Sequence, residues 1–354
     1  MKQLRYGLVI ILFLLLVLIC ALITLILLNR YQIIPGDSIL FGFDYIPIIW
    51  VSILVLPTSL GFLLIKRVKI GLPVLFGYLI TLLFLGDISI SALLKNERTD
   101  KLDGDSFSVL VINVQYYSSG IENVFHAIKS TNVDLALISE NILPEDNEVN
   151  IDTLIKPYSI YGINNELAIL SLYPVKEFNV IQLPSRQTSL SGENDIATLH
   201  LNPKRSFVHA VIEINGKLVN LIAIRFVAGR AKNHSIGERL NFGRYLANTH
   251  LNEVRFFIDY LHTLKGPIIF GGDLNCPPSS KIIYMLNQIA EDAYLEDHFW
   301  GGFTFNTKFP SIRLDYIYYL NNVIPLSSEI LDIKVSDHSP IYATFLLPNK
   351  ETIN

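Results

Sequence analysis

The stretch Gly271-Gly272-Asp273-Leu274-Asn275 organises the rest of the chain. It follows the apolar run Pro267 to Phe270, so a buried strand is predicted to end where the two glycines let the backbone turn. Asp273 and Asn275 then lie two residues apart on one side of the strand exit. A carboxylate there can hold a water or a metal ion, and an amide can orient an oxyanion. An Asx-rich turn that only closes the strand explains these five residues equally well. The rest of the chain must decide between the two readings.

The N-terminal part of the chain consists mainly of apolar residues. Leu8 to Leu28 contains no charged residue and has the roughly 20 residues that a helix needs to cross a bilayer. Two further apolar runs follow, from Tyr45 to Ile65 and from Ile70 to Leu85. We predict three membrane-spanning helices within a membrane domain of residues 1–94. A cleaved signal peptide is the alternative for the first run, but no small-x-small cleavage site follows it.

Basic residues flank the three runs unevenly. Lys2 and Arg5 precede the first run, and the segment Lys66–Lys69 places three basic residues between the second and third. Arg30 is the only basic residue between the first and second runs. The positive-inside rule therefore places the N-terminus in the cytoplasm and the residues after the third helix on the outer or periplasmic side. No ionisable residue lies well inside a run, which argues against a channel or transporter.

From Phe107 onward, short β-rich runs alternate with helical ones. Residues 95–106 are charged and polar and are predicted to link the membrane part to a domain of residues 107–347, with residues 348–354 as a tail. Asn215-Gly216, between two β-rich runs, is the strongest short hairpin signal in the chain. Many strands, one tight hairpin and interspersed helices predict an α/β domain with mixed sheets covered by helices.

Acidic and amide residues recur at the predicted strand ends, and each of them is ordinary when taken alone. The strings that contain them are Ile112-Asn113-Val114, Ile138-Ser139-Glu140, Ala168-Ile169-Leu170-Ser171 with Pro174, Gly272-Asp273-Leu274-Asn275, Arg313-Leu314-Asp315-Tyr316-Ile317 and Ser336-Asp337-His338-Ser339-Pro340. In this order they resemble the endonuclease/exonuclease/phosphatase superfamily of metal-dependent phosphoesterases. The resemblance covers about Phe107 to Leu347, and the last three strings are quite specific.

The resemblance implies a four-layered α/β sandwich of two packed mixed sheets flanked by helices. It also implies a Mg²⁺ cofactor, with Mn²⁺ as a second possibility. Glu140 is similar to the principal metal ligand of the superfamily, and Asn113 and Asp337 would complete or orient the ligand shell. Asn113 is also expected to meet the substrate.

The remaining roles follow from the same resemblance. Asp273 is similar to the residue that activates the attacking water, and Asn275 to the residue that holds a phosphate oxygen. His338 would stabilise the charge on the phosphoryl group, and Asp315 would fix the ring of His338. An ion pair between Asp315 and Arg313 is the alternative for that carboxylate, because both residues lie on one face of the predicted strand.

One position departs from the superfamily pattern. At the end of the predicted strand Val219 to Phe226, most branches carry a histidine, whereas this chain has Arg225. An arginine can bind phosphate oxygens bidentately, so Arg225 is a candidate for both catalysis and substrate binding. The string Asn248-Thr249-His250 looks like the missing histidine motif, but we read it as the start of a helix rather than a strand end. In the basic segment from Arg225 to Arg244, Arg225 is predicted to contact the scissile phosphate and the basic residues after it a second phosphate or anionic headgroups; a solvated basic loop is the alternative.

Three functions are compatible with the sequence. Three spans followed by an outer domain resemble the membrane-anchored branch that includes teicoplanin-resistance-type proteins, which implies a lipid bilayer as partner and a phosphorylated, lipid-linked substrate. An exported, membrane-tethered nuclease is the second reading. It is disfavoured because the residues from Lys101 onward contain 20 Lys and Arg against 27 Asp and Glu. The third is a scaffold protein whose catalysis is impaired by Arg225. The sequence does not indicate an oligomeric state.

Overall fold

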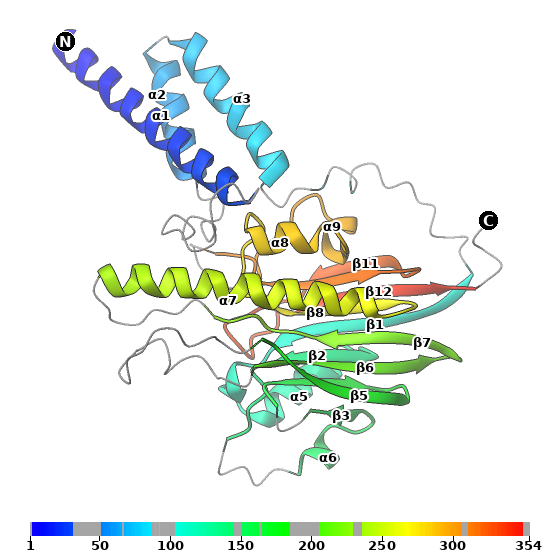
Figure 1. Ribbon diagram of the computed structural model, residues 1–354. Coiled ribbons are helices and arrows are strands. Elements are labelled where there is room, and N and C mark those ends of the chain that lie inside the picture. The colour runs from blue at the N-terminus through cyan, green and yellow to red at the C-terminus, as the bar shows by residue number, and fades with distance from the viewer. Residues whose placement is uncertain are drawn as a thin grey trace. The chain divides into compact units, whose positions relative to one another are not determined.

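The computed structural model describes residues 2–30, 51–65, 67–85, 89, 92, 103–144, 150–162, 165–184, 205–228, 236–305 and 311–349. The chain divides into two compact units (Figure 1). One contains the N-terminal helices together with parts of the segments 231–248 and 276–285, and the other contains both β-sheets. The predicted metal and catalytic residues all belong to the second unit.

The N-terminal unit begins with three apolar helices: α1 (Lys2–Arg30), α2 (Ser52–Leu64) and α3 (Val68–Leu85). Tyr6–Leu28 within α1 is long and apolar enough to cross a membrane. The apolar helical segments Ile53–Leu64 and Lys69–Ile80 are shorter. At a rise of about 1.5 Å per residue, neither segment by itself spans a hydrocarbon core of about 30 Å. The prediction of three long spanning helices is therefore supported for the first alone among the described residues. Residues 45–50 of the predicted second span lie outside them.

The second unit contains two six-stranded mixed sheets. The first has the order β11-β12-β1-β2-β4-β3, and β1 and β2 are its parallel pair. Its strands are β1 (Gly104–Asn113), β2 (Leu135–Ser139), β3 (Ser159–Tyr161), β4 (Leu167–Ser171), β11 (Ile324–Ile330) and β12 (Ile341–Pro348). The second has the order β5-β6-β7-β8-β10-β9, and β7 and β8 are its parallel pair. Its strands are β5 (Val175–Gln182), β6 (Ser206–Ile214), β7 (Lys217–Ala223), β8 (Ile268–Asp273), β9 (Glu291–Asp292) and β10 (Asp315–Leu320).

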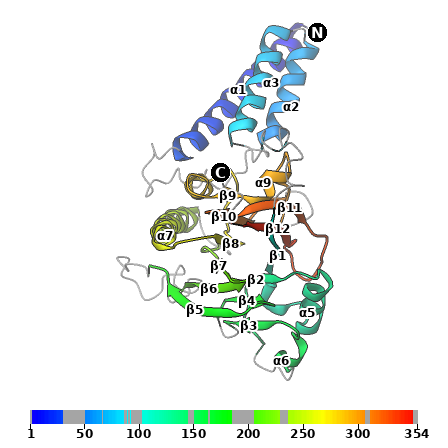
Figure 2. The same cartoon turned by 90° about the vertical axis from the view of Figure 1, so that its right-hand side faces the viewer.

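Helices lie outside the two sheets (Figure 2). Helix α5 (Ile121–Ser130) packs Val124 and Phe125 against Leu110 and Ile112 of β1. On α7 (Ile236–Thr263), the ring of Phe257 contacts aromatic rings of β6 and β8. The other short helices are η4 (Gln115–Tyr117), α6 (Ile151–Leu154), α8 (Lys281–Leu286) and α9 (Ala293–Asp297). The predicted class, two mixed sheets flanked by helices, is confirmed.

Gly271 and Gly272 lie within strand β8, where they allow neighbouring parts of the chain to pack closely against its backbone. We predicted that the strand ends at Phe270, but β8 continues through both glycines to Asp273. A Cβ on Gly271 would lie 2.7 Å from Cγ2 of Val111 in the opposite sheet. Gly272 has a φ of 148°, and a Cβ there would lie 1.9 Å from the carbonyl oxygen of Ile224. The absence of side chains at these two positions lets β8 run between β1 and the end of β7.

Several predicted boundaries differ from the observed ones. Strand β1 begins at Gly104, inside the segment predicted to be a linker, and pairs there with Pro348 of β12. Helix α7 begins at Ile236, so Asn248-Thr249-His250 lies inside a helix. The Asn215-Gly216 hairpin is confirmed, since both residues have positive φ between the antiparallel strands β6 and β7.

Candidate active site

The strand topology brings the predicted site residues together at the ends of neighbouring strands in each sheet. In the first sheet Asn113, at the end of β1, lies opposite Ser139 on the parallel strand β2, and Glu140 follows directly. In the second sheet Asp273 ends β8 and pairs with Asp315, which begins the antiparallel strand β10. Arg225 follows β7, which runs parallel to β8. Polar residues far apart in the sequence therefore meet where these strands end.

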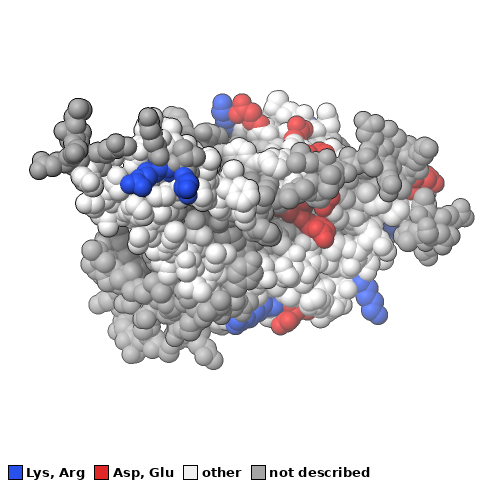
Figure 3. All heavy atoms as spheres, turned by 90° about the horizontal axis from the view of Figure 1, so that it is seen from above, with Lys and Arg blue, Asp and Glu red and all other residues white. Residues whose placement is uncertain are grey.

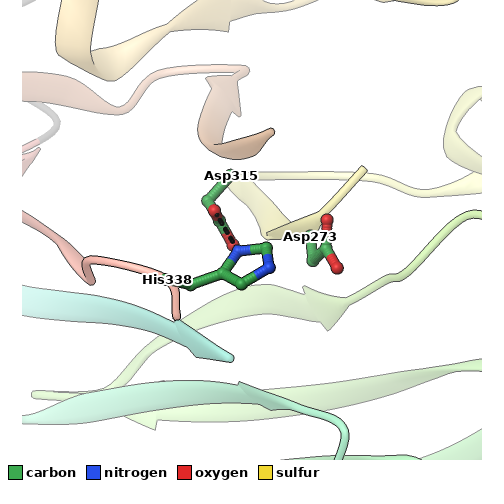
Figure 4. Close-up of side chains that lie close together, drawn as sticks. All are labelled: Asp273, Asp315 and His338. Carbon is green, nitrogen blue, oxygen red and sulfur yellow. Dashed lines mark hydrogen bonds and ion pairs between the residues drawn. The ribbon is translucent and has the colours of Figure 1, made fainter. Parts of the chain in front are cut away.

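His338 and Asp315 form a buried pair (Figure 4). Nδ1 of His338 lies 2.7 Å from Oδ2 of Asp315. Burial alone would lower the pKa of His338, but the carboxylates of Asp315 and Asp273 outweigh burial and raise it to about 9. The ring is therefore an imidazolium at neutral pH, with Nδ1–H donated to Asp315. The alternative ion pair of Asp315 with Arg313 is not observed. Asp315 pairs with His338, and Nη2 of Arg313 contacts Asp292 at 2.8 Å.

Asp273 is buried and held from two sides. Nδ2 of Asn113 donates to Oδ2 of Asp273 at 3.1 Å, and the backbone N–H of Asn275 donates to Oδ1 at 3.1 Å. The side-chain amide of Asn275 donates to the carbonyl of Phe226 at 3.1 Å. Asn113 and Asn275 therefore fix the orientation of this carboxylate.

Arg225 lies among three carboxylates. Its Nη2 contacts Oε1 of Glu140 at 2.6 Å and its Nε contacts Oδ2 of Asp273 at 3.3 Å. Its Nη1 donates to Oε1 of Glu166, the shortest contact of the three. Burial alone would lower the pKa of Arg225, but Asp273, Glu166 and Glu140 outweigh it, so the guanidinium stays charged. Arg225 thus joins the ends of β2, β7 and β8.

The residues present fit a divalent cation. Glu140, Glu166, Asp273 and Asp315 supply four carboxylates, whereas Arg225 and His338 supply two cations. Burial raises the pKa of Glu140, as does the neighbouring Asp273 carboxylate, which shows that negative charge is costly here. Carboxylate oxygens of Asp273 and Asp315 lie within 4.8 Å of each other, and Oδ1 of Asp315 is buried without a hydrogen-bond partner among the described residues. Excess carboxylate oxygen in a largely buried site suits a hard divalent ion.

The remaining predicted residues occupy different places. Asp337 is half-buried beside His338, and its charge is another that raises the pKa of His338. His250 is fully buried in α7, and its Nε2 bonds to the carbonyl of Val227 at 2.7 Å. The prediction that Asn248-Thr249-His250 is not a strand end is confirmed, although the helix begins earlier than at this string. Of the basic segment after Arg225, Arg230 and Lys232 lie outside the described residues, as do the side chains of Arg239 and Arg244.

Sequence reasoning missed Glu166 and Asn141. Asn141 is fully buried directly after Glu140, and its backbone N–H donates to the carbonyl of Glu166 at 2.9 Å. No short string marks either residue, because both act through contacts with segments distant in sequence.

Comparison with known proteins agrees with the fold. The model of the endonuclease/exonuclease/phosphatase family matches residues 110–338. An endonuclease/exonuclease/phosphatase structure from Bacteroides vulgatus is 16% identical, with a TM-score of 0.52, and covers 68% of this chain and 99% of its own. A family structure from Bacteroides thetaiotaomicron is 12% identical, with a TM-score of 0.51, and covers 70% of this chain and 100% of its own.

A third similar structure, truncated TDP2 from Caenorhabditis elegans, is 20% identical, with a TM-score of 0.50, and covers 70% of this chain and 100% of its own. At these identities the structures establish the fold alone. No curated protein matches the chain. Because the family model spans more than half of the sequence, the chain belongs to the endonuclease/exonuclease/phosphatase family.

Proposed function

We propose that this chain is a membrane-anchored phosphoesterase that hydrolyses phosphate or pyrophosphate esters with the help of a divalent cation, Mg²⁺ or Mn²⁺. One observation carries the proposal: the buried group of Asp273, Asp315 and His338, in which one oxygen or nitrogen atom of each side chain lies within 4.8 Å of those of the other two (Figure 4). The group places a carboxylate that can act as a base, Asp273, beside a charged hydrogen-bond donor, His338. This arrangement suits the hydrolysis of a phosphate ester.

Each residue has a distinct task in this proposal. Glu140 and Asn113 would hold the cation, oriented by Asp337, and the bound ion would neutralise charge on the phosphoryl oxygens. Asp273 accepts a proton from the attacking water as the new P–O bond forms and the ester bond breaks. His338 donates Nε2–H to a phosphoryl oxygen, and Asp315 holds its ring. Arg225 and Asn275 bind the remaining phosphate oxygens.

A lipid-linked substrate agrees best with the rest of the chain. The apolar segment Tyr6–Leu28 is a candidate anchor, and an anchor raises the local concentration of the domain at a bilayer that confines a lipid substrate. The residues from Lys101 onward carry more acidic than basic side chains. On the face seen in Figure 3, described Lys and Arg side chains occur as small separate groups, and some of these groups lie beside Asp or Glu side chains. A nucleic acid partner is therefore less favoured.

The reaction is tested with the full-length protein in detergent. It is supplied in parallel with a polyprenyl pyrophosphate, duplex DNA and a phosphoinositide, with Mg²⁺ and with a chelator. We expect phosphate release from the polyprenyl pyrophosphate, and we expect the chelator to abolish it. Faster cleavage of DNA would replace the proposal with the tethered nuclease. No hydrolysis of any substrate would favour the scaffold reading.

The orientation in the membrane is a separate proposal. We infer that α1 is a retained anchor, that α2 and α3 cross the bilayer together with their flanking residues, and that the N-terminus is cytoplasmic. The basic residues Lys2, Arg5 and Lys66–Lys69 support this orientation, which places the phosphoesterase domain on the outer side. A reporter enzyme that is active only in the cytoplasm, fused after Asn354, is expected to be inactive. An active fusion would refute the orientation.

A further inference from the structure

We propose that Glu166 is a positioning residue that holds the guanidinium of Arg225 in the orientation that meets the substrate phosphate. The inference rests on the proposed function and adds a residue to it. Arg225 makes its closest contact with Glu166, through Nη1, whereas Nη2 contacts Glu140 at 2.6 Å and Nε contacts Asp273 at 3.3 Å. Glu166 thus holds one edge of the guanidinium, and the two predicted site carboxylates hold the others.

The backbone around Glu166 is firmly fixed. The N–H of Asn141 donates to the carbonyl of Glu166 at 2.9 Å. The side-chain amide of Asn141 donates to the carbonyls of Gly162 at 3.2 Å and Asn165 at 3.0 Å. Asn141 is fully buried and directly follows Glu140 in the chain. The loop that carries Glu166 is therefore tied to the end of the strand that carries Glu140, so both carboxylates have defined places relative to Arg225.

Glu166 is the one carboxylate around Arg225 that has no other task in the proposed reaction. Glu140 would bind the cation and Asp273 would accept the proton, so the negative charge of each is shared with another partner during the reaction. Glu166 can keep its contact with Nη1 throughout. This contact leaves Nη2 free to exchange Glu140 for a phosphate oxygen when the cation is bound.

An arginine at this position requires such a partner, whereas a histidine does not. A guanidinium stays charged at all relevant pH values, and a buried charge is costly unless an opposite charge and hydrogen bonds compensate it. Arg225 is only 6% exposed. Without Glu166, the guanidinium would rest on Glu140 and Asp273 alone, where it competes with the cation and is turned away from the substrate.

The test measures binding of inorganic phosphate to the Mg²⁺-loaded, detergent-solubilised protein by calorimetry. Four proteins are compared: the parent, Glu166→Gln, Arg225→Ala and the double variant. Neutralising an acid near an anion site should by charge alone strengthen phosphate binding. Positioning predicts the opposite, a weakening of about tenfold in Glu166→Gln, within the coupling range of residues in one network. In the Arg225→Ala background only the charge effect remains, so Glu166→Gln should then strengthen binding slightly.

This reversal of sign separates positioning from misfolding, which would weaken phosphate binding in both backgrounds. Glu213→Gln is the matched control, because Glu213 also pairs with one cation, Lys176, but lies at the hairpin end of β6. It should leave phosphate binding unchanged. An active parent whose phosphate affinity rises or stays the same in Glu166→Gln would refute the role of Glu166 alone. A parent that neither binds phosphate nor hydrolyses an ester would refute the proposed function together with this inference.

Discussion

Replacing Asp273 with asparagine is expected to lower kcat about a thousandfold on any ester that the parent protein hydrolyses, because general base catalysis contributes about 10²- to 10⁴-fold. The carboxylate is buried and accepts hydrogen bonds from Asn113 and from the backbone of Asn275. An asparagine keeps nearly the same shape but cannot take the proton of the attacking water. The measurement is steady-state hydrolysis of a soluble phosphate ester at saturating Mg²⁺.

The control is Asp259→Asn, an exposed position on α7. It is expected to leave both kcat and the melting temperature unchanged. KM in Asp273→Asn should change much less than kcat, because the proton transfer belongs to the transition state. A kcat within threefold of the parent in Asp273→Asn would exclude this residue as the base.

Replacing Glu140 with glutamine is expected to lower turnover at least a hundredfold at a fixed Mg²⁺ concentration, on the scale of losing an electrostatic contact in the transition state. The amide retains one oxygen but loses the charge that attracts the cation. Mn²⁺ binding, measured by calorimetry without substrate, should weaken in parallel. The fold should persist, because Arg225 retains its contacts with Glu166 and Asp273.

Two further measurements complete this test. Raising the Mn²⁺ concentration should restore part of the turnover of Glu140→Gln, since the defect lies in metal binding. Glu213→Gln, which removes a half-buried carboxylate from the same unit, should bind Mn²⁺ as the parent does. Unchanged turnover of Glu140→Gln after chelator treatment would show that Glu140 is not a metal ligand.

Local pattern was enough to predict the strand ends that carry the site. Asn113 follows and Asp315 precedes a run of β-branched, aromatic and apolar residues, and β1 ends at the first of these residues whereas β10 begins at the second. The hairpin at Asn215-Gly216 was predicted for the same reason, because a turn with two positive φ angles depends on the two residues that form it. Such features depend on near neighbours in the chain, so a single sequence contains them.

Boundaries set by contacts with distant residues were predicted less well. The run from Ile268 to Phe270 marked a strand, but its continuation through the two glycines depends on the approach of Val111 and Ile224. The extension of β1 back to Gly104 depends on its partner Pro348. In both cases the partner lies more than forty residues away, and backbone pairing outweighs local preference.

The sequence by itself determined the family, the order of the site residues and the apolar segment Tyr6–Leu28. Only the tertiary structure decided which carboxylates surround Arg225 and that Arg313 pairs with Asp292 rather than Asp315. The physical reason is that charged side chains select partners by distance and burial, and strand pairing sets both. Glu166 and Arg225 are 59 residues apart in the chain. They meet because the start of β4 in one sheet lies close to the end of β7 in the other.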